Sequence, residues 1–303
     1  MVVKVVQCSY NNYVKRSWKI CEKIVNTTEH WSSLLYRFIM KKKVIYYSDE
    51  LNDEFAEATI QAREIDGSYV YLHSGAWKKF THFFWYRMIA TPLAFLYMKF
   101  YFGHKIVNKK VLKDAKKTGW FIYGNHTHFM ADALIPTMLS TPKDMYVIVH
   151  PDNVSMPFLG RITPSLGALP LPDDAQATRN FIRAVDRRIA EKCAVTIYPE
   201  AHIWPYYTGI RPFRDTSFRY PIKCEVPSFC FTNTYQKRRW TKVPRIVTYV
   251  DGPFYPRQEL SGAAQRKDLR DRIYETMKKR SQNNTVTLVE YRKKGEEQEK
   301  END

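Results

Sequence analysis

The chain has 303 residues, of which 48 are Lys or Arg and 31 are Asp or Glu, so its formal net charge is +17. Hydrophobic residues make up 44% and aromatic residues 15% of the sequence, which excludes disorder for most of the chain and allows a sizeable core. Five cysteines without a C-x-x-C pair exclude a disulfide scaffold and indicate reduced thiols in a cytosolic protein. The positive charge predicts an anionic partner, namely a membrane surface, an acidic carrier protein, a phosphorylated substrate or a nucleic acid.

Residues 1–39 form an N-terminal extension that differs from the rest of the chain. Basic and polar residues are scattered through it with weak periodicity, and Lys4 interrupts the apolar start, so no cleavable signal peptide is expected. Met40 offers a second start, and the extension is either a mis-assigned start or a short amphipathic arm. Residues 40–105 are expected to form an N-terminal region of their own.

The most apolar stretch of the chain is residues 77–103, WKKFTHFFWYRMIATPLAFLYMKFYFG. Its four basic residues leave no uncharged window long enough for a transmembrane helix, and Pro92 is expected to bend it into two short helical pieces. Aromatic and basic residues in this mixture are typical of a segment that lies in one leaflet of a membrane. We expect its lipid-facing side chains to include Trp77, Phe84, Trp85 and Leu96. The alternative is an ordinary buried helical hairpin.

From about residue 118 the pattern alternates between strands and helices. Apolar runs predict buried strands at 120–123, 145–149, 194–198, 228–232, 246–250 and 285–290. Helices are expected over about 174–192 and 258–280, each with one apolar face. This order predicts an α/β domain over residues 106–292, with a largely parallel sheet covered by helices on both faces. The acidic and basic tail, residues 293–303, is expected to be disordered.

Histidines and carboxylates gather just after the predicted strands, where parallel sheets form their ligand sites. Four of the eight histidines, His126, His128, His150 and His202, fall in these loops. His126 followed by Asp132 suggests a general base whose tautomer the carboxylate fixes. The G-x-S-x-G motif is absent, so we expect direct attack by a substrate hydroxyl without a covalent acyl-enzyme.

Four sequence blocks, in order, resemble the motifs of the glycerophospholipid acyltransferase family, which includes the 1-acylglycerol-3-phosphate acyltransferases. They are NH…D from Asn125 to Asp132, PFLGRITPSLGALPLPDD (157–174), YPEAHIWPYYTGIRPF (198–213) and PSFCFTNTYQK (227–237). The resemblance covers about residues 80–255, and the aromatic segment before the first block matches the membrane-dipping segment of that family.

Three positions depart from the family pattern. His126 and Asp132 are separated by five residues where the family has four, whereas His128 lies at i, i+4 from Asp132. His126 is assigned as the base because the motif opens with Asn-His, and His128 is the alternative. Pro172 stands where many members have arginine. The third block keeps its glutamate as Glu200 but lacks the arginine that would bind substrate phosphate, so His202, Arg211, Arg214 or Arg161 is expected to supply that charge.

The resemblance implies an O-acyltransferase that uses acyl-CoA, acyl carrier protein or an acyl phosphate to acylate a lysophospholipid. It further implies a peripheral or monotopic protein at the cytoplasmic face of the cell membrane, on anionic lipid, with no cofactor and no metal. One alternative is a metal-dependent hydrolase that uses the strand-end histidines. Another is a non-enzymatic basic lipid-binding protein. The basic run 236–240, QKRRW, is interpreted as a solvated surface and not as a nucleic-acid reader.

Overall fold

The computed structural model describes residues 43–55, 61–72, 75–157 and 159–295. The chain separates into two compact units, residues 1–44 and 45–303, and the description below concerns the second. The predictions for residues 1–39 and for the tail beyond residue 295 lie outside the described residues.

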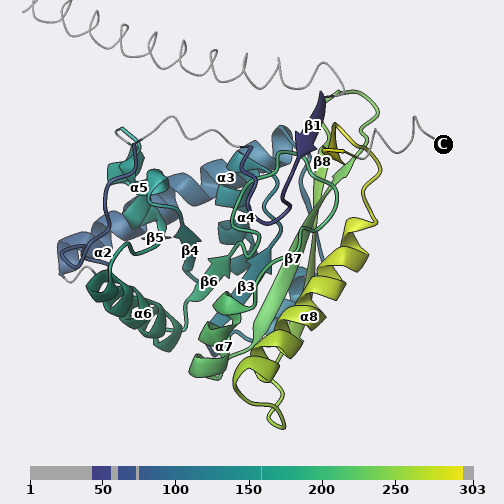
Figure 1. Cartoon of the computed structure of the whole chain (residues 1–303). Helices are drawn as coiled ribbons and strands as arrows, with labels where there is room; N and C mark the ends of the chain where they lie inside the picture. The colour runs from purple at the N-terminus through teal and green to yellow at the C-terminus, as the bar shows by residue number, and fades with distance from the viewer. Residues whose placement is uncertain (1–42, 56–60, 73–74, 158, 296–303) are drawn as a thin grey trace, which may run out of the picture. The chain divides into compact units, whose positions relative to one another are not determined.

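A seven-stranded mixed sheet with the order β2-β8-β7-β3-β6-β4-β5 forms the centre of this unit (Figure 1). Its strands are β2 (Lys105–Val107), β3 (Trp120–Gly124), β4 (Met145–Val149), β5 (Ala168–Pro170), β6 (Ala194–Ile197), β7 (Ser228–Gln236) and β8 (Arg245–Phe254). Neighbouring strands are parallel except β7 and β8, which pair antiparallel from Ser228↔Phe254 to Gln236↔Arg245. The carboxyl ends of β3 to β7 therefore lie at one edge of the sheet. The predicted α/β class with a largely parallel sheet is confirmed.

Three of the predicted strands, β3, β6 and β7, are buried along all or nearly all of their length. All five residues of β3 and all four of β6 are buried, as their apolar runs predict. Three short strands were not predicted: β1 (Lys43–Tyr47), β2 and β5. The last strand, β9 (Val289–Lys293), begins later than expected, and it pairs with β1 in a separate two-stranded sheet.

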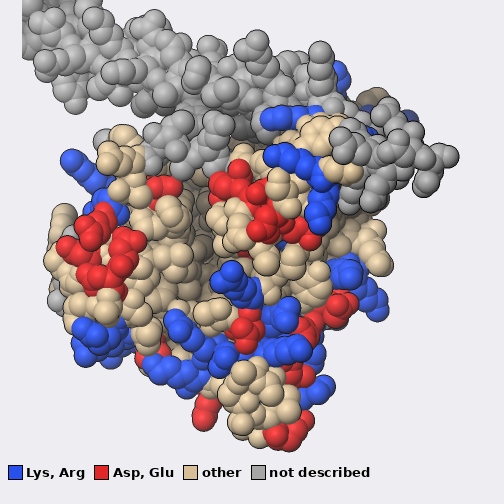
Figure 2. All heavy atoms as spheres, viewed as in Figure 1, with Lys and Arg blue, Asp and Glu red and all other residues tan. Residues whose placement is uncertain are grey.

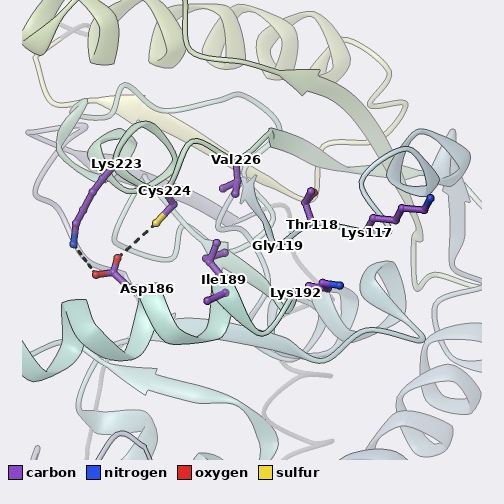
Figure 3. A pocket seen from close by; sticks show the side chains of 10 residues that line it. Lys117, Thr118, Gly119, Asp186, Ile189, Lys192, Lys223, Cys224 and Val226 are labelled. Carbon is purple, nitrogen blue, oxygen red and sulfur yellow. Dashed lines mark hydrogen bonds and ion pairs between the residues drawn. The ribbon is translucent and has the colours of Figure 1, made fainter.

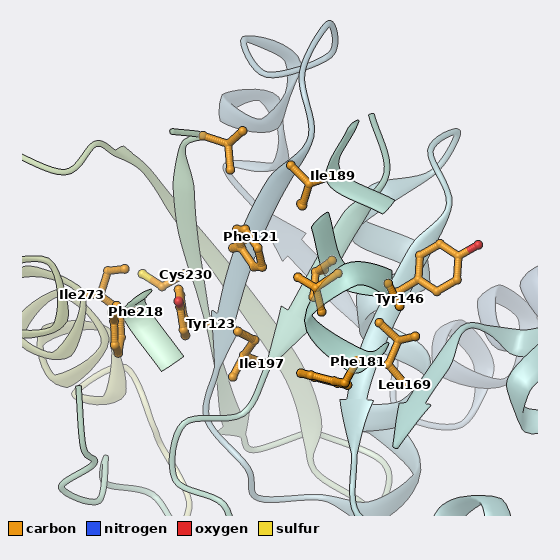
Figure 4. Packing of buried hydrophobic residues seen from close by; sticks show 14 of the residues in the cluster. Phe121, Tyr123, Tyr146, Leu169, Phe181, Ile189, Ile197, Phe218, Cys230 and Ile273 are labelled. Carbon is orange, nitrogen blue, oxygen red and sulfur yellow. The ribbon is translucent and has the colours of Figure 1, made fainter. Parts of the chain in front are cut away.

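Helices cover both faces of the seven-stranded sheet. On one face lie α6 (Ala175–Ala190), α7 (Arg219–Cys224) and α8 (Gly262–Ser281), as Figure 1 shows. Their apolar stripes meet the sheet, for example Phe181 of α6 and Ile273 of α8 with Phe121 and Tyr123 of β3, in the cluster drawn in Figure 4. Asp174 starts α6 by accepting a hydrogen bond from the Ala177 N–H at 2.6 Å. On the other face lies α4 (Phe129–Ser140), together with the helix described next.

The aromatic segment forms a helix without interruption from Ala76 to Phe100, and not the two bent pieces that Pro92 was expected to produce. It comprises α2 (Ala76–His82), a π-helical stretch (Phe83–Ala90) and α3 (Thr91–Phe100). Pro92 occupies the first turn of α3, where its missing N–H breaks no bond, and the Thr91 N–H reaches back to the carbonyl of Tyr86. The helix is held to the sheet domain by Arg87, which donates to Asp144 at 2.6 Å, and by buried Tyr86 and Met98.

Most of the apolar residues of this helix face outward. The four side chains predicted to meet lipid have large exposed fractions: 71% for Trp77, 41% for Phe84, 37% for Trp85 and 54% for Leu96. Other exposed apolar side chains on the same helix are Phe80, Phe83, Met88, Leu93, Phe95 and Phe100. This contradicts the alternative of a buried hairpin. Within the described residues, no helix is both long and apolar enough to span a bilayer.

The predicted boundary between residues 105 and 106 falls inside β2. Ile65 and Tyr71, from the region before it, belong to the same core cluster as the sheet residues. Charges of both signs occur on the face shown in Figure 2, where Lys and Arg are frequent over α6 and α7. Net charge by itself therefore does not locate an anion-binding site.

Candidate active site

The loop after β3 brings His126 and Asp132 together at the carboxyl edge of the sheet. β3 ends at Gly124, and α4 begins at Phe129, so Asp132 lies in the first turn of that helix. A side chain at Gly124 would overlap the ring of Phe231 on β7, since a Cβ there would lie 2.2 Å from a ring carbon. Only glycine therefore lets the chain pass β7 and turn towards α4 at this point.

The His126 Nδ1 atom lies 2.9 Å from Asp132 Oδ2. The same carboxylate oxygen accepts the backbone N–H groups of Thr127 and His128, each at 2.9 Å. With an ionised carboxylate as acceptor, Nδ1 carries the proton and Nε2 presents its lone pair. In the part of the chain that the structure describes, Nε2 has no hydrogen-bond partner, and the His126 side chain is 18% exposed against 2% for Asp132. This geometry is that of a general base with a buried orienting carboxylate.

Three further residues, which the sequence analysis did not name as site residues, hold the His126–Asp132 pair in place. Tyr198 stacks on the His126 ring with a centroid distance of 4.4 Å, and its hydroxyl donates to the main-chain carbonyl of Asp132. Asn233 of β7 donates from Nδ2 to Asp132 Oδ1 at 3.3 Å. Asn125 holds Asn233 in turn by accepting its backbone N–H at 2.8 Å and donating to its carbonyl at 3.1 Å. All three lie inside the motif blocks quoted above, and Asn233 is in addition a polar residue within the buried run of β7.

The polar network continues from Asn233 to a buried histidine. Thr248 of β8 donates to Asn233 Oδ1 at 2.7 Å, and His104 Nε2 lies 2.8 Å from the Thr248 hydroxyl. Burial lowers the pKa of His104 to about 4, so this imidazole is neutral at physiological pH. His104 also borders an apolar groove of about 380 Å³ beside α3, whose other lining residues are Phe95, Leu96, Lys99, Phe100, Ile106 and Met138.

His128 has a different environment from His126. It precedes α4 as its N-cap, and its Nδ1 accepts the Ala131 N–H at 3.2 Å, while Nε2 lies 3.3 Å from the Tyr206 hydroxyl. The residue is 6% exposed, and burial lowers its pKa despite the nearby charge of Asp132. Both ring nitrogens are thus occupied, which argues against the alternative that His128 serves as the base.

The Glu200 carboxylate is buried beneath the same loop. Its Oε2 accepts the backbone N–H of His126 at 3.2 Å, and its Oε1 accepts the backbone N–H of Arg211 at 3.2 Å. Burial raises the pKa of Glu200, and the charge of Arg211 opposes that effect. Glu200 therefore supports the backbone that carries His126, and its enclosed carboxylate has no surface with which to touch a substrate.

The expectation that Arg211 binds substrate phosphate is contradicted by its position. Its side chain is 0% exposed, and its guanidinium pairs with Glu200 at 3.4 Å, lies 4.8 Å above the Trp204 ring and donates to the main-chain carbonyl of His202. Both terminal nitrogens of the guanidinium thus have partners inside the protein, and the Nε atom is buried as well. The Pro- and Tyr-rich connection folds Arg211 into the protein instead of over the strand ends.

The other predicted cationic residues lie on the surface. Arg161 is exposed at the end of a short turn, Leu159–Arg161, and Arg214 is exposed too. His202 Nδ1 lies 2.6 Å from a carboxylate oxygen of Glu54. None of the described contacts joins these three residues to the His126–Asp132 pair.

The strand-end histidines do not converge on a common centre. His126 pairs with Asp132, His150 with Asp152 at 3.0 Å, and His202 with Glu54. Within the described ranges, no group of three or more His, Cys, Asp or Glu residues has an arrangement that would hold a metal ion. The ligand cluster on which the hydrolase alternative depends is therefore not formed by these residues.

A larger hollow, of about 480 Å³, lies at the opposite edge of the sheet (Figure 3). It is lined by residues that precede β3, β6 and β7, among them Gly119, Lys192 and Val226. Asp186 within it binds Lys223 at 2.6 Å, and burial raises the pKa of the neighbouring Cys224 thiol to about 11. None of the predicted site residues reaches this hollow, and its cysteine is not activated.

Comparison with known proteins gives a similar solved structure and no sequence relative. No protein-family model matches the chain, and no curated protein sequence matches it. The chain is similar to the crystal structure of the 1-acyl-sn-glycerophosphate (LPA) acyltransferase PlsC from Thermotoga maritima, with a TM-score of 0.48 and 15% sequence identity. The match covers 68% of this chain and 88% of that chain. A likeness of this degree does not establish a family or an activity for the present chain.

Proposed function

We propose that this protein is an O-acyltransferase that uses His126 as general base to acylate the hydroxyl of a lysophospholipid. The observation that carries the proposal is the His126–Asp132 pair, in which Nδ1 is engaged at 2.9 Å and Nε2 has no partner among the described residues. Such a pair accepts a hydroxyl proton at neutral pH and stabilises the imidazolium that forms.

The reaction would proceed by direct attack. The acceptor oxygen forms a bond to the thioester or acyl-phosphate carbonyl while its proton passes to His126 Nε2. The tetrahedral intermediate then collapses, the carbonyl re-forms, and the thiolate or phosphate leaves and takes the proton from the imidazolium. The described cysteines support a mechanism without a covalent intermediate, because Cys230 is buried in β7 and burial raises the pKa of Cys193 and Cys224 to about 11.

The proposed acyl donor is acyl-CoA, acyl carrier protein or an acyl phosphate, and the proposed site of action is the cytoplasmic face of the cell membrane. The exposed apolar face of the helix Ala76–Phe100 supports membrane association, because a helix that exposes this many large apolar side chains is typical of a membrane interface. The groove beside α3 that contains Phe95, Phe100 and Met138 is apolar and suits an acyl chain. With Arg211 enclosed, Arg161 and Arg214 are the candidates for contact with a phosphate.

The test is to incubate the purified protein with each donor and a panel of lysolipids on vesicles, and to identify the products by mass. The proposal expects a diacyl product that depends on both donor and acceptor. Folded protein that forms no product with any pair would overturn it. Fatty acid released without an acceptor, together with bound metal in elemental analysis, would instead support the hydrolase alternative.

Membrane association has its own test. The double variant Phe84→Glu, Leu96→Glu should be released from anionic vesicles, because each change places a charge on the exposed apolar face. Salt should weaken wild-type binding only in part, since apolar insertion is not screened. Complete release by moderate salt would show that binding is purely electrostatic.

A further inference from the structure

The connection between β7 and β8 is a basic hairpin with a tryptophan near its middle. β7 ends at Gln236, which pairs with Arg245 at the start of β8, so residues 237–244 form the connection. Residues 237–245, KRRWTKVPR, include five basic side chains and no acidic one. The proposed catalytic chemistry uses none of them.

The base of this hairpin is fixed to the end of the aromatic helix. Arg238 donates to the main-chain carbonyl of Tyr101 at 2.7 Å. Arg238 and Arg245 both lie against Gly103, where an added Cβ would come within 3.5 Å of each guanidinium group. The Lys237 N–H donates to the Thr285 hydroxyl at 3.0 Å. The hairpin and the helix Ala76–Phe100 are therefore joined at the carboxyl edge of the sheet.

The tip of the hairpin is exposed. Trp240 has an exposed fraction of 86%, the highest among the large hydrophobic side chains of the described residues. The Arg239 guanidinium lies 4.7 Å from the centroid of the indole ring, and Lys237, Arg239 and Lys242 are exposed. An indole with adjacent cations combines an apolar body with groups that bind phosphate, the composition of side chains at a membrane–water interface.

We propose that residues 239–242 form a second contact with an anionic bilayer, in which Trp240 enters the headgroup layer and the basic side chains bind lipid phosphates. This inference rests on the membrane association in the proposed function. The basic charge of the tip is complementary to an anionic surface. The adjoining end of the helix exposes Leu96 and Phe100, by 54% and 76%. This part of the surface is apolar, whereas a nucleic acid is bound mainly through cationic contacts to its phosphates, so the two surfaces together favour lipid over a nucleic acid.

The direct test is co-sedimentation with vesicles of phosphatidylcholine mixed with phosphatidylglycerol, compared with vesicles of phosphatidylcholine alone. Arg239→Ala should weaken binding to the anionic vesicles by about fivefold, the contribution expected of one basic group at such a surface. Trp240→Ala should weaken binding as well, because it removes the indole that enters the headgroup layer. Tyr255→Ala is the matched control, because Tyr255 is 57% exposed and follows β8 at the opposite edge of the sheet. Its binding should equal that of the wild type.

A further variant and a second measurement separate the two proposals. Wild-type protein that binds neither vesicle would overturn both. If Leu96→Glu releases the protein but Trp240→Ala binds like the wild type, the hairpin contact is wrong and the helix contact stands. Hydrogen exchange of the wild-type protein should show protection of the peptide that spans 237–244 when anionic vesicles are added. Protection by an acidic carrier protein, and none by vesicles, would assign the hairpin to a protein partner and overturn the inference.

Discussion

Asp132→Asn tests how the buried carboxylate serves His126. Asp132 Oδ2 accepts three hydrogen bonds, from His126 Nδ1 and from two backbone N–H groups, and Oδ1 accepts one from Asn233. An amide at this position can keep its oxygen towards the three donors, but it loses the charge that stabilises the imidazolium. In Ser-His-Asp hydrolases the corresponding change costs about 10⁴ in kcat because the histidine adopts the wrong tautomer. Here the three donors on one oxygen keep the tautomer, so we expect the loss of charge to cost part of the roughly 10²–10⁴-fold that general-base catalysis contributes.

The same change has a calculable effect on the fold. With its oxygen towards His126, the new amide points its NH₂ group at the NH₂ group of Asn233, and two buried donors then face each other. This should cost about 1–3 kcal/mol of the free energy of unfolding. Adding Asn233→Asp should restore a donor–acceptor pair, since Thr248 still finds an acceptor there. The double variant should thus recover stability but not rate.

The assay is acyl transfer to a lysophospholipid under single-turnover conditions, with circular dichroism and urea unfolding on the same samples. Near-normal turnover by Asp132→Asn would refute the role of the carboxylate. Recovery of the rate in the double variant would contradict the requirement for a carboxylate at position 132 itself.

Three further predictions concern the enclosed residues and the reaction path. Arg211→Ala should lower the free energy of unfolding by about 3–5 kcal/mol, because Glu200 loses its buried partner. A variant that keeps its stability and changes only the KM for phosphorylated acceptors would show that Arg211 contacts the substrate instead. Burial lowers the pKa of His104 from its ordinary value of 6.5 to about 4. Between these two pH values the unfolded chain binds more protons than the folded chain. The folded protein is therefore fully stable with respect to His104 only above about pH 6.5, and it loses stability as the pH falls. Wild-type protein should lose about 2 kcal/mol more than His104→Gln from about pH 7 to pH 5 in urea unfolding, and parallel pH curves would refute this. Protein incubated with donor alone should show no acyl adduct in its intact mass, and an adduct would indicate a covalent intermediate.

The fold was predictable where burial leaves a clear pattern in the sequence. β3 and β6 are apolar runs that are fully buried in the sheet, β4 is an apolar run that is half-buried, and α6 repeats Phe181, Val185 and Ile189 on one stripe. β2 and β5 have three residues each, too few to show a period. Pro92 did not break its helix, because the π-helical stretch before it moves the hydrogen bonds that proline would otherwise disrupt.

The candidate site was predictable only in its local part. His126 and Asp132 lie six positions apart, so one loop and one helical turn bring them together. Asn233 and His104 depend on pairings across the sheet, and their contacts with Asp132 and Thr248 join residues more than 100 positions apart. No local pattern carries that information.

Arg211 shows a different limit of sequence reading. Its Pro- and Tyr-rich surroundings indicate an irregular connection, but irregular segments can lie over a site or fold into the interior. Arg211 lies in the interior because the buried carboxylate of Glu200 gives its guanidinium a charged partner and the ring of Trp204 gives it an aromatic face there. That enclosure is a tertiary property.

The most direct test of the central claim compares wild-type protein with His126→Ala for acyl transfer to a lysophospholipid, measured as product mass at equal concentrations of folded protein. His128→Ala serves as the matched control from the same loop, read at temperatures where it remains folded. Loss of product in His126→Ala, with transfer retained in His128→Ala, is the predicted result. Transfer retained in His126→Ala, or lost only in His128→Ala, would contradict the assignment of His126 as the base.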